Sequence, residues 1–252
     1  MKTNLIGIAG KMQAGKDTLG KMIIYLVDSN VDKSHIKYSI DNNCLLEDIE
    51  EEPSCDNPWE IKKFAGKVKE IVSILTGIPL EDLEKQEVKD RVLGEEWLVW
   101  KEESTFDSEF KLLHLEEPLT FGNCKKVQYT VRQLLQEVGT DAMRNVIHPN
   151  VWVNALFADY IPVQYHDGGI FYNKKEYPNW IITDVRFPNE AEAIKSRGGV
   201  LIRVERNKDT GTHPSETALD DYKKWNYIVP NVGTPKDLLY QAEFIVDTLK
   251  LK

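Results

Sequence analysis

Apolar and polar positions along the chain alternate between short continuous runs and helical repeats. The run Leu5–Ala9 is continuous, which is typical of a strand buried on both faces. Apolar residues then recur at helical spacing from Leu19, so the pattern predicts a helix from Lys16 to about Asp28. A polar loop that contains two glycines separates these elements. The chain therefore begins with a predicted strand, loop and helix, in that order.

Later segments repeat this alternation. Further buried strands are expected over Trp180–Val185, Val200–Val204 and Asn226–Val229. Amphipathic or well-capped helices are expected over Phe64–Leu75, Thr130–Val138, Asn189–Arg197 and Thr234–Leu249. Strands that alternate with helices imply an α/β fold in which helices cover both faces of a parallel sheet.

Three weaker patterns add to this outline. They indicate an exposed helix over Leu80–Val92, a helix after Pro149 and a small hairpin over Val163–Tyr172. No internal repeat and no low-complexity linker interrupts the chain, so one domain fits better than two.

The least periodic stretches are interpreted as insertions into a single domain that spans residues 1–252. They cover about 29–58, 95–126 and 161–179. The first is acidic and is interpreted as a peripheral insertion or a mobile loop. The second is interpreted as short strands or a helical insert. A polar stretch at about 205–216 is expected to act as a lid over a bound ligand.

The loop after the first strand carries the clearest chemical signal. Gly10 to Lys16 fits the pattern G-x-x-x-x-G-K, and it lies between a strand and a helix as this motif requires. Its glycines let successive N–H groups point at one anion, and the lysine reaches the β and γ phosphates. The residues expected to bind ATP are Lys11, Ala14, Gly15, Lys16, Asp17 and Thr18.

Asp17 departs from the usual form of this loop. The residue after the lysine is commonly Ser or Thr, whose hydroxyl contacts Mg²⁺. The carboxylate of Asp17 can hold Mg²⁺ directly or through water, can lie near substrate phosphates, or can be a first-turn acid that stabilises the helix dipole. Asp17 is therefore the candidate metal ligand, with these alternatives open.

A phosphate loop indicates a bound triphosphate but not a reaction. The reaction depends on a second anion site. Arg186 follows the strand that ends at Asp184, and ligands bind beyond the carboxyl ends of parallel strands. Lys69 and Arg132 are further candidates, since arginine grips phosphate with two hydrogen bonds. Asp184 can hold Mg²⁺ through water, orient Arg186 or a substrate group, or act as a helix or turn acid.

Composition limits the other options. The formal net charge of −9 argues against general binding to nucleic acid or a membrane surface. Cys44, Cys55 and Cys124 show neither metal spacing nor an even set, which favours reduced thiols over a Cys44–Cys55 bridge. With no signal peptide or long apolar span, we expect a soluble cytoplasmic protein that has no membrane partner.

Several of these segments together resemble the deoxynucleoside monophosphate kinases of large tailed bacteriophages. The segments that carry the resemblance run in order along nearly the whole chain: Gly10–Thr18, Phe64–Lys69, Val131–Asp141 (VRQLLQEVGTD), Trp152-Val153, Asp184–Glu190 (DVRFPNE), His213–Glu216 and Asn231–Thr234. VRQLLQEVGTD together with DVRFPNE is the specific part, because the G-K-D-T ending of the loop occurs in other small-molecule kinases.

The resemblance implies a P-loop kinase that transfers the γ-phosphoryl group of ATP, with Mg²⁺, to a deoxynucleoside 5′-monophosphate for DNA precursor synthesis. Lys16, Arg132 and Arg186 would be catalytic. The monophosphate pocket would be lined by Lys69, Arg132, Gly139, Thr140, Trp152, Asp184, Arg186 and Glu190. On helical spacing alone, Trp152 is more typical of a core residue than of a substrate platform.

Two other functions stay open at this point. One is a kinase of another small phosphorylated metabolite, such as dephospho-coenzyme A. The other is a nucleotide-dependent switch without catalysis, although no N-K-x-D motif is present. The accepted base and the choice between a monomer and a homodimer are equally open.

Overall fold

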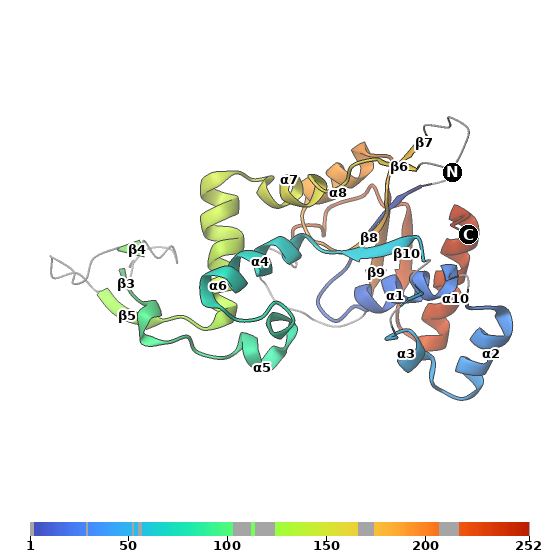
Figure 1. Ribbon diagram of the computed structural model, residues 1–252, viewed down its shortest axis with the longest axis horizontal. Helices are drawn as coiled ribbons and strands as arrows, with labels where there is room; N and C mark the ends of the chain where they lie inside the picture. Colours follow the sequence, from blue (N-terminus) through green and yellow to red (C-terminus); the bar gives the residue numbers. More distant parts are fainter. Residues whose placement is uncertain are drawn as a thin grey trace. The chain divides into compact units, whose positions relative to one another are not determined.

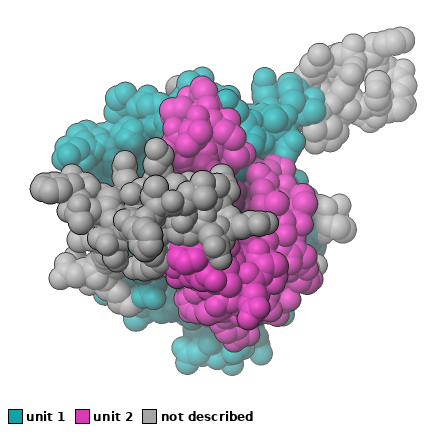
Figure 2. Space-filling view, turned by 90° about the vertical axis from the view of Figure 1, so that its left-hand side faces the viewer, with its two compact units in different colours: residues 1–66, 152–252 teal, residues 67–151 magenta. Residues whose placement is uncertain are grey.

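A computed structural model of the 252-residue chain describes residues 3–28, 30–51, 53–54, 57–102, 112–113, 124–165, 174–206 and 217–251. These form two compact units, residues 1–66 with 152–252 and residues 67–151 (Figure 2). Each unit is described by itself, and one kinase domain with insertions stays a prediction. Residues 207–216 of the expected lid and 166–172 of the expected hairpin lie outside the described residues.

The first unit is built on a five-stranded sheet in the order β10-β9-β1-β8-β2, of which β8, β9 and β10 are labelled in Figure 1. Its strands are β1 (Leu5–Ala9), β2 (Trp59–Lys62), β8 (Asn179–Val185), β9 (Val200–Glu205) and β10 (Tyr227–Pro230). Every pairing is parallel. The α/β parallel sheet predicted from the alternation is confirmed, although β2 gave no strand signal because only Trp59 is fully buried.

Helices cover both faces of this sheet, as predicted. Ile6 and Ile8 of β1 belong to the same buried cluster as apolar residues of α1 (Lys16–Val27) and α10 (Pro235–Leu249). Gly7 points to the other face, where an added Cβ would lie 2.6 Å from Cδ1 of Ile194. Ile194 is on α8 (Pro188–Ser196), so α8 covers the face opposite α1 and α10.

The acidic stretch after α1 contains two helices among its described residues, which the pattern did not predict, and its interpretation as a peripheral insertion or a mobile loop stays a prediction. Asp32 caps α2 (Lys33–Asp41) by accepting hydrogen bonds from the backbone N–H groups of Ser34 and His35. Leu45 and Ile49 of the following segment, which contains α3 (Leu45–Asp48), join the main buried cluster. The many exposed charges of these two helices hid their few buried positions from pattern analysis.

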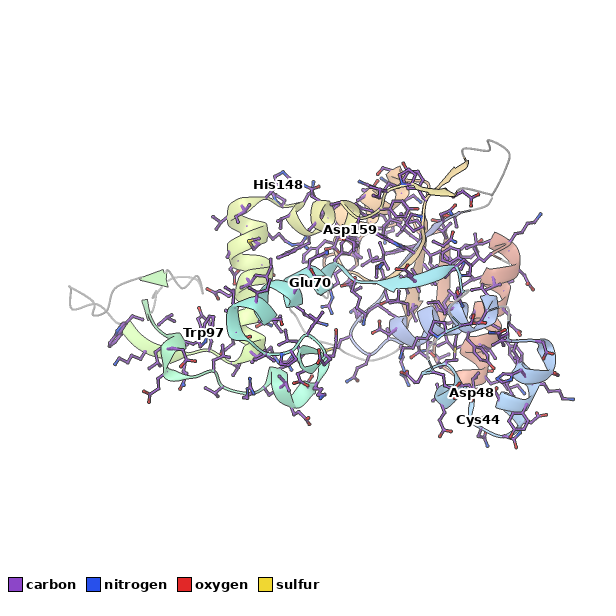
Figure 3. The ribbon with its side chains drawn as sticks, in the orientation of Figure 1. Cys44, Asp48, Glu70, Trp97, His148 and Asp159 are labelled. Carbon is purple, nitrogen blue, oxygen red and sulfur yellow. The ribbon has the colours of Figure 1, made fainter. Side chains whose placement is uncertain are left out.

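The thiol of Cys44 lies at the start of α3. Cys44 Sγ donates to Asp48 Oδ2 at 3.3 Å, and both residues are labelled in Figure 3. Burial and this carboxylate raise the pKa of the Cys44 thiol. It is a free cysteine, as expected for a reduced thiol.

Other helix predictions were largely right but differ at their ends. Thr234 caps α10 through a capping box, as predicted. Helix α8 begins at Pro188 with Phe187 at its N-cap position, whereas the sequence predicted a helix that starts at Asn189. The remaining elements of this unit are α7 (Val151–Phe157), whose first residue is assigned to the second unit, and the antiparallel pair β6 (Val163–Tyr165) and β7 (Lys174–Glu176).

The second unit has its own small apolar cluster around Val72, Leu83 and Val131. Its elements are most of α4 (Phe64–Thr76), η1 (Asp82–Glu84), α5 (Gln86–Lys89), η2 (Glu95–Trp97), the sheet of β3 (Leu98–Glu102), β4 (Leu112–Leu113) and β5 (Cys124–Gln128), α6 (Val131–Gln136) and η3 (Glu137–Ile147). The single exposed helix expected over Leu80–Val92 is instead two short turns. Of the two options for residues 95–126, short strands are confirmed.

The capping box at Thr130 is confirmed, but the helix that it starts does not stop near Val138. It continues as the π-helix η3 to Ile147. A π-helix is rare and often marks a functional segment. Within the described parts of the chain, no helix is long and apolar enough to cross a membrane.

Two neighbouring leucines of α3 test whether this helix belongs to the core. Leu45 is 5% exposed and Leu46 is 47% exposed. We expect Leu45→Ala to lower the free energy of unfolding by about 2–3 kcal/mol and Leu46→Ala by less than about 0.5 kcal/mol. Urea denaturation measures both, and equal effects would show that α3 does not pack as described.

Candidate active site

The phosphate-binding loop leaves β1 at the carboxyl edge of the sheet and is shaped by its glycines. Gly15 has φ 98°, a left-handed conformation that side chains rarely adopt. A Cβ on Gly10 would lie 2.6 Å from the carbonyl oxygen of Val204 on β9. Gln13 also has a positive φ, 59°. The predicted turn from strand to helix is therefore present, with backbone that curls as an anion cradle requires.

The lysine of the motif lies over its own loop. Lys16 Nζ donates to the carbonyl oxygens of Gly10 and Lys11, each at 2.7 Å. These bonds hold a positive charge where the N-terminus of α1 also favours an anion. Ala14 is buried and its N–H donates to the Lys11 carbonyl at 3.1 Å, which closes the turn.

Two residues from distant parts of the chain support the loop. Asn231 Nδ2 donates to the Ala14 carbonyl at 2.8 Å, and the Asn231 N–H donates to the Glu205 carbonyl at 2.7 Å. Arg206, which follows β9, reaches the Gln13 carbonyl at 3.5 Å. The sequence singled out Asn231 only as part of a resembling segment and assigned it no role.

Asp17 is held by groups that the sequence analysis did not identify. Thr183 Oγ1 donates to Asp17 Oδ1 at 2.5 Å, and Lys63 Nζ lies 3.0 Å from the same oxygen. Partial burial raises the pKa of Asp17, but the Thr183 hydroxyl and the Lys63 ammonium outweigh it and hold the pKa below its usual value. Asp17 is therefore a carboxylate at neutral pH.

A carboxylate beside a phosphate loop fits Mg²⁺. Within the described ranges, no group of three or more His, Cys, Asp or Glu residues could hold a metal ion. Magnesium commonly keeps several waters and binds through one or two carboxylates together with substrate phosphates. Asp17 supplies one such oxygen ligand, and Thr18, the next residue, is half-buried in the first turn of α1.

The predicted meeting of Arg186 and the loop is present in the first unit. One small hollow at the carboxyl edge is lined by Gly10 and Lys11 after β1, by Val185 and Arg186 at the end of β8, and by Arg203 on β9. It is also lined by Leu219, Asp220 and Trp225. Lys11 Nζ lies 4.0 Å from Asp220 Oδ2. Parallel pairing of β1 with β8 and β9 brings these cations together.

Asp184 and Glu190 have clear structural partners. Asp184 Oδ1 and Oδ2 accept hydrogen bonds from the N–H groups of Phe64 and Ala65, both at 2.8 Å, so this carboxylate caps α4. Burial raises the pKa of Asp184, while these two bonds oppose the shift. Glu190 Oε2 accepts from the N–H groups of Arg186 and Phe187 at 2.8 Å and 3.1 Å and caps α8. Contact of either acid with substrate stays a prediction.

The remaining residues of the predicted substrate site divide between the units. Trp152 belongs to the first unit and is 4% exposed, as a core residue would be. Lys69 pairs with Glu84, and Arg132 Nη2 lies 2.9 Å from Asp90 Oδ1, within the second unit. Gly139 and Thr140 lie on η3 of that unit.

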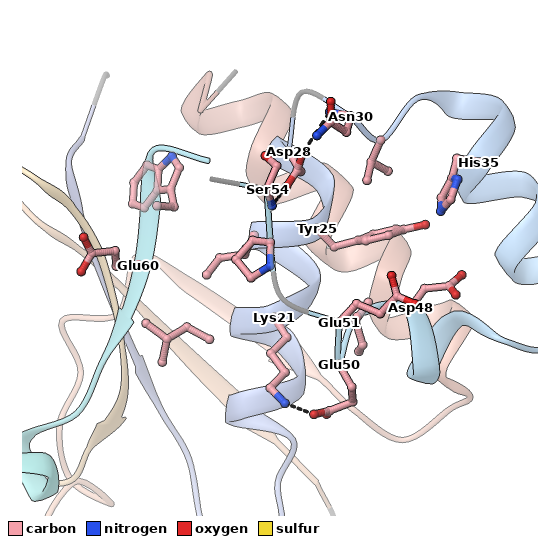
Figure 4. Close-up of a pocket in the computed structure, with 16 residues that line it drawn as sticks. Lys21, Tyr25, Asp28, Asn30, His35, Asp48, Glu50, Glu51, Ser54 and Glu60 are labelled. Carbon is pink, nitrogen blue, oxygen red and sulfur yellow. Dashed lines mark hydrogen bonds and ion pairs between the residues drawn. The ribbon is translucent and has the colours of Figure 1, made fainter. Parts of the chain in front are cut away.

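A cavity of about 650 Å³ lies at the other end of α1 (Figure 4). Its lining includes Asp28, Asp48, Glu50, Glu51 and Glu60, and the only lysine or arginine among its lining residues is Lys21, which pairs with Glu50. Such a lining repels polyphosphates. The carboxyl edge, rather than this larger cavity, is therefore the candidate nucleotide site.

Comparison with known proteins identifies the family of the chain. A family model described as deoxynucleotide monophosphate kinase matches residues 81–241, more than half of the chain. This chain belongs to the deoxynucleotide monophosphate kinase family. The match begins after the phosphate loop and includes Arg132, Thr140, Trp152 and Arg186, so it does not depend on the loop motif.

Individual relatives agree with this family. A putative deoxynucleotide monophosphate kinase of Acanthamoeba polyphaga mimivirus is 35% identical over 123 residues, which are 47% of this chain and 62% of that protein. The deoxynucleotide monophosphate kinase of Enterobacteria phage T4 is 29% identical over 126 residues, 49% of this chain and 47% of that protein. Each match spans less than two thirds of the relative's own length.

Gly15 and Gly66 provide a matched test of the loop geometry. Gly15 has φ 98°, and a Cβ there would lie 2.4 Å from Asn231 Nδ2, whereas a Cβ on Gly66 would meet nothing within 4 Å. We expect Gly15→Ala to lower the free energy of unfolding by about 1–2 kcal/mol. Gly66→Ala, in helix α4, should leave it unchanged or raise it by up to about 1 kcal/mol. Urea denaturation compares them, and an unaffected Gly15→Ala protein would contradict the loop conformation.

Proposed function

We propose that this protein transfers the γ-phosphoryl group of ATP to a deoxynucleoside 5′-monophosphate, giving the deoxynucleoside diphosphate and ADP. The observation that carries the proposal is the shared hollow of Lys11 and Arg186 beside the Lys16 loop, in a member of this family. The donor triphosphate would lie on the loop N–H groups and Lys16. The acceptor phosphate would bind Arg186.

The reaction needs alignment and charge compensation more than a base. The acceptor phosphate is deprotonated at neutral pH, so its oxygen can attack the γ-phosphorus as the β–γ bridging bond breaks and ADP leaves. In the proposed arrangement Lys16, Arg132 and Arg186 compensate the charge that spreads over the transferred group. The other proposed substrate contacts are Lys69, Gly139, Thr140, Trp152, Asp184 and Glu190.

We propose Asp17 as the protein ligand of the Mg²⁺ that accompanies ATP. When bound, this ion would neutralise phosphate charge and hold the β and γ oxygens in place. Around it, Lys11, Ala14, Gly15 and Thr18 would complete the ATP site, with the loop backbone supplying N–H donors.

The two alternative functions become outcomes of one assay. ADP formation is followed by coupled spectrophotometry with ATP, Mg²⁺ and each of the four common deoxynucleoside monophosphates in turn. We expect turnover that requires at least one of them. Turnover with dephospho-coenzyme A alone would favour the metabolite kinase. Nucleotide binding without any turnover would favour the switch.

Lys16→Ala and Lys21→Ala are the matched variants for this assay. We expect Lys16→Ala to lower turnover by about 10²–10³-fold, because a cation that stabilises the transferred group is lost. Lys21 lies further along the same helix and pairs with Glu50, so Lys21→Ala should keep turnover within about twofold. Near-normal turnover of Lys16→Ala would remove the loop from the reaction.

Arg186→Ala tests whether Arg186 binds the monophosphate rather than ATP. We expect it to raise the KM for the monophosphate by about 10–100-fold, since charge-assisted hydrogen bonds to phosphate are lost. The Kd for ATP, measured by calorimetry, should change little. Arg197→Ala is the control, because Arg197 lies at the end of α8 and donates to the Ala193 carbonyl. A loss confined to ATP affinity would contradict the acceptor role of Arg186.

A further inference from the structure

Thr183 is a buried polar residue on β8 with a precise partner outside its own strand. It is 1% exposed, and its hydroxyl donates to Asp17 Oδ1 at 2.5 Å. Lys63, at the end of β2, reaches the same oxygen at 3.0 Å. Both of these contacts are made to Oδ1, and the Asp17 side chain is 57% exposed.

We propose that Thr183 is a positioning residue for the metal: its hydroxyl fixes the Asp17 carboxylate through Oδ1 and leaves Oδ2 as a preset ligand for Mg²⁺. The inference rests on the proposed ATP site. It assigns a role to a residue that lies outside the phosphate-loop motif and that the sequence analysis left without one.

The packing of Thr183 supports this role because it allows the side chain little freedom. A Cβ added to Gly20 of α1 would lie 2.7 Å from Thr183 Cγ2, so the methyl group faces Gly20 closely. A β-branched side chain with its methyl fixed has a fixed hydroxyl direction. Gly20 therefore lets α1 approach β8, and that approach brings Asp17 within reach of Thr183.

The number of oxygens on the ligand explains why an Asp carboxylate must be held in one orientation to bind Mg²⁺. A loop Ser or Thr presents one oxygen to Mg²⁺, whereas a free Asp side chain presents two that exchange by rotation. Magnesium demands near-ideal octahedral geometry. Holding Oδ1 with a hydroxyl and an ammonium removes that rotational freedom before the metal binds.

The test compares the affinity for ATP with and without metal. Isothermal calorimetry gives the Kd of metal-free ATP, measured in EDTA, and the Kd of Mg·ATP. The first Kd divided by the second reports how much the metal tightens the binding of ATP. We expect Asp17→Asn to lower this ratio by more than about tenfold and Thr183→Val by about three- to tenfold. Thr183→Ser, which restores the hydroxyl, should stay within about twofold of the wild type.

Thr3→Val is the matched control, because Thr3 is 6% exposed and donates to the Leu5 carbonyl away from the loop. It should leave the ratio unchanged, and Thr183→Ala gives a second way to remove the hydroxyl should valine disturb the packing against Gly20. A ratio that falls in Asp17→Asn but not in Thr183→Val or Thr183→Ala overturns the role of Thr183. A ratio unaffected by Asp17→Asn overturns Asp17 as the ligand and the inference with it. Absence of ATP binding to the wild type would instead overturn the proposed function.

Discussion

Parallel pairing of β1 with β8 is the interaction on which the rest of the first unit depends. It aligns Ala9 with Val185, so the phosphate loop and Arg186 leave the sheet at the same edge. The same alignment brings Thr183 to Asp17 and lets Asp184 reach the start of α4. A slip of this pairing by one residue would turn these side chains to the opposite face and separate all of these contacts.

Acidic residues at and just after the end of β8 hold two helix N-termini. Asp184 caps α4 and Glu190 caps α8, and Arg186 lies between these two acids in the sequence. Both acids, which the resemblance places in the substrate pocket, hold helix N-termini, a role that satisfies otherwise unpaired N–H groups.

Sequence reasoning was strongest where burial is complete. Leu5–Ala9 and the run through Ile181 and Ile182 are continuous because both of their faces are covered, and such runs are easily recognised. Arg186 could be predicted from its place after a buried strand. Lys63 also directly follows a strand, β2. Because β2 is only partly buried, the sequence did not predict this strand and Lys63 could not be recognised in the same way.

Partners that come from distant segments could not be predicted. Nothing local to Thr183 indicates Asp17, and nothing local to Asn231 indicates the Ala14 carbonyl. The helices α2 and α3 were missed for a different reason, since their few buried residues are outnumbered by exposed acids. Capping boxes, by contrast, are local, and those at Thr130 and Thr234 were predicted correctly.

The central claim is that two phosphate groups meet at this one edge of the sheet. A crystal structure with a bisubstrate analogue, in which adenosine and a deoxynucleoside are joined through a chain of phosphates, tests it most directly. The account predicts that the phosphate chain runs from the loop N–H groups and Lys16 to the guanidinium of Arg186. A chain of phosphates bound elsewhere, or one that engages the loop while Arg186 contacts none of it, would contradict the account.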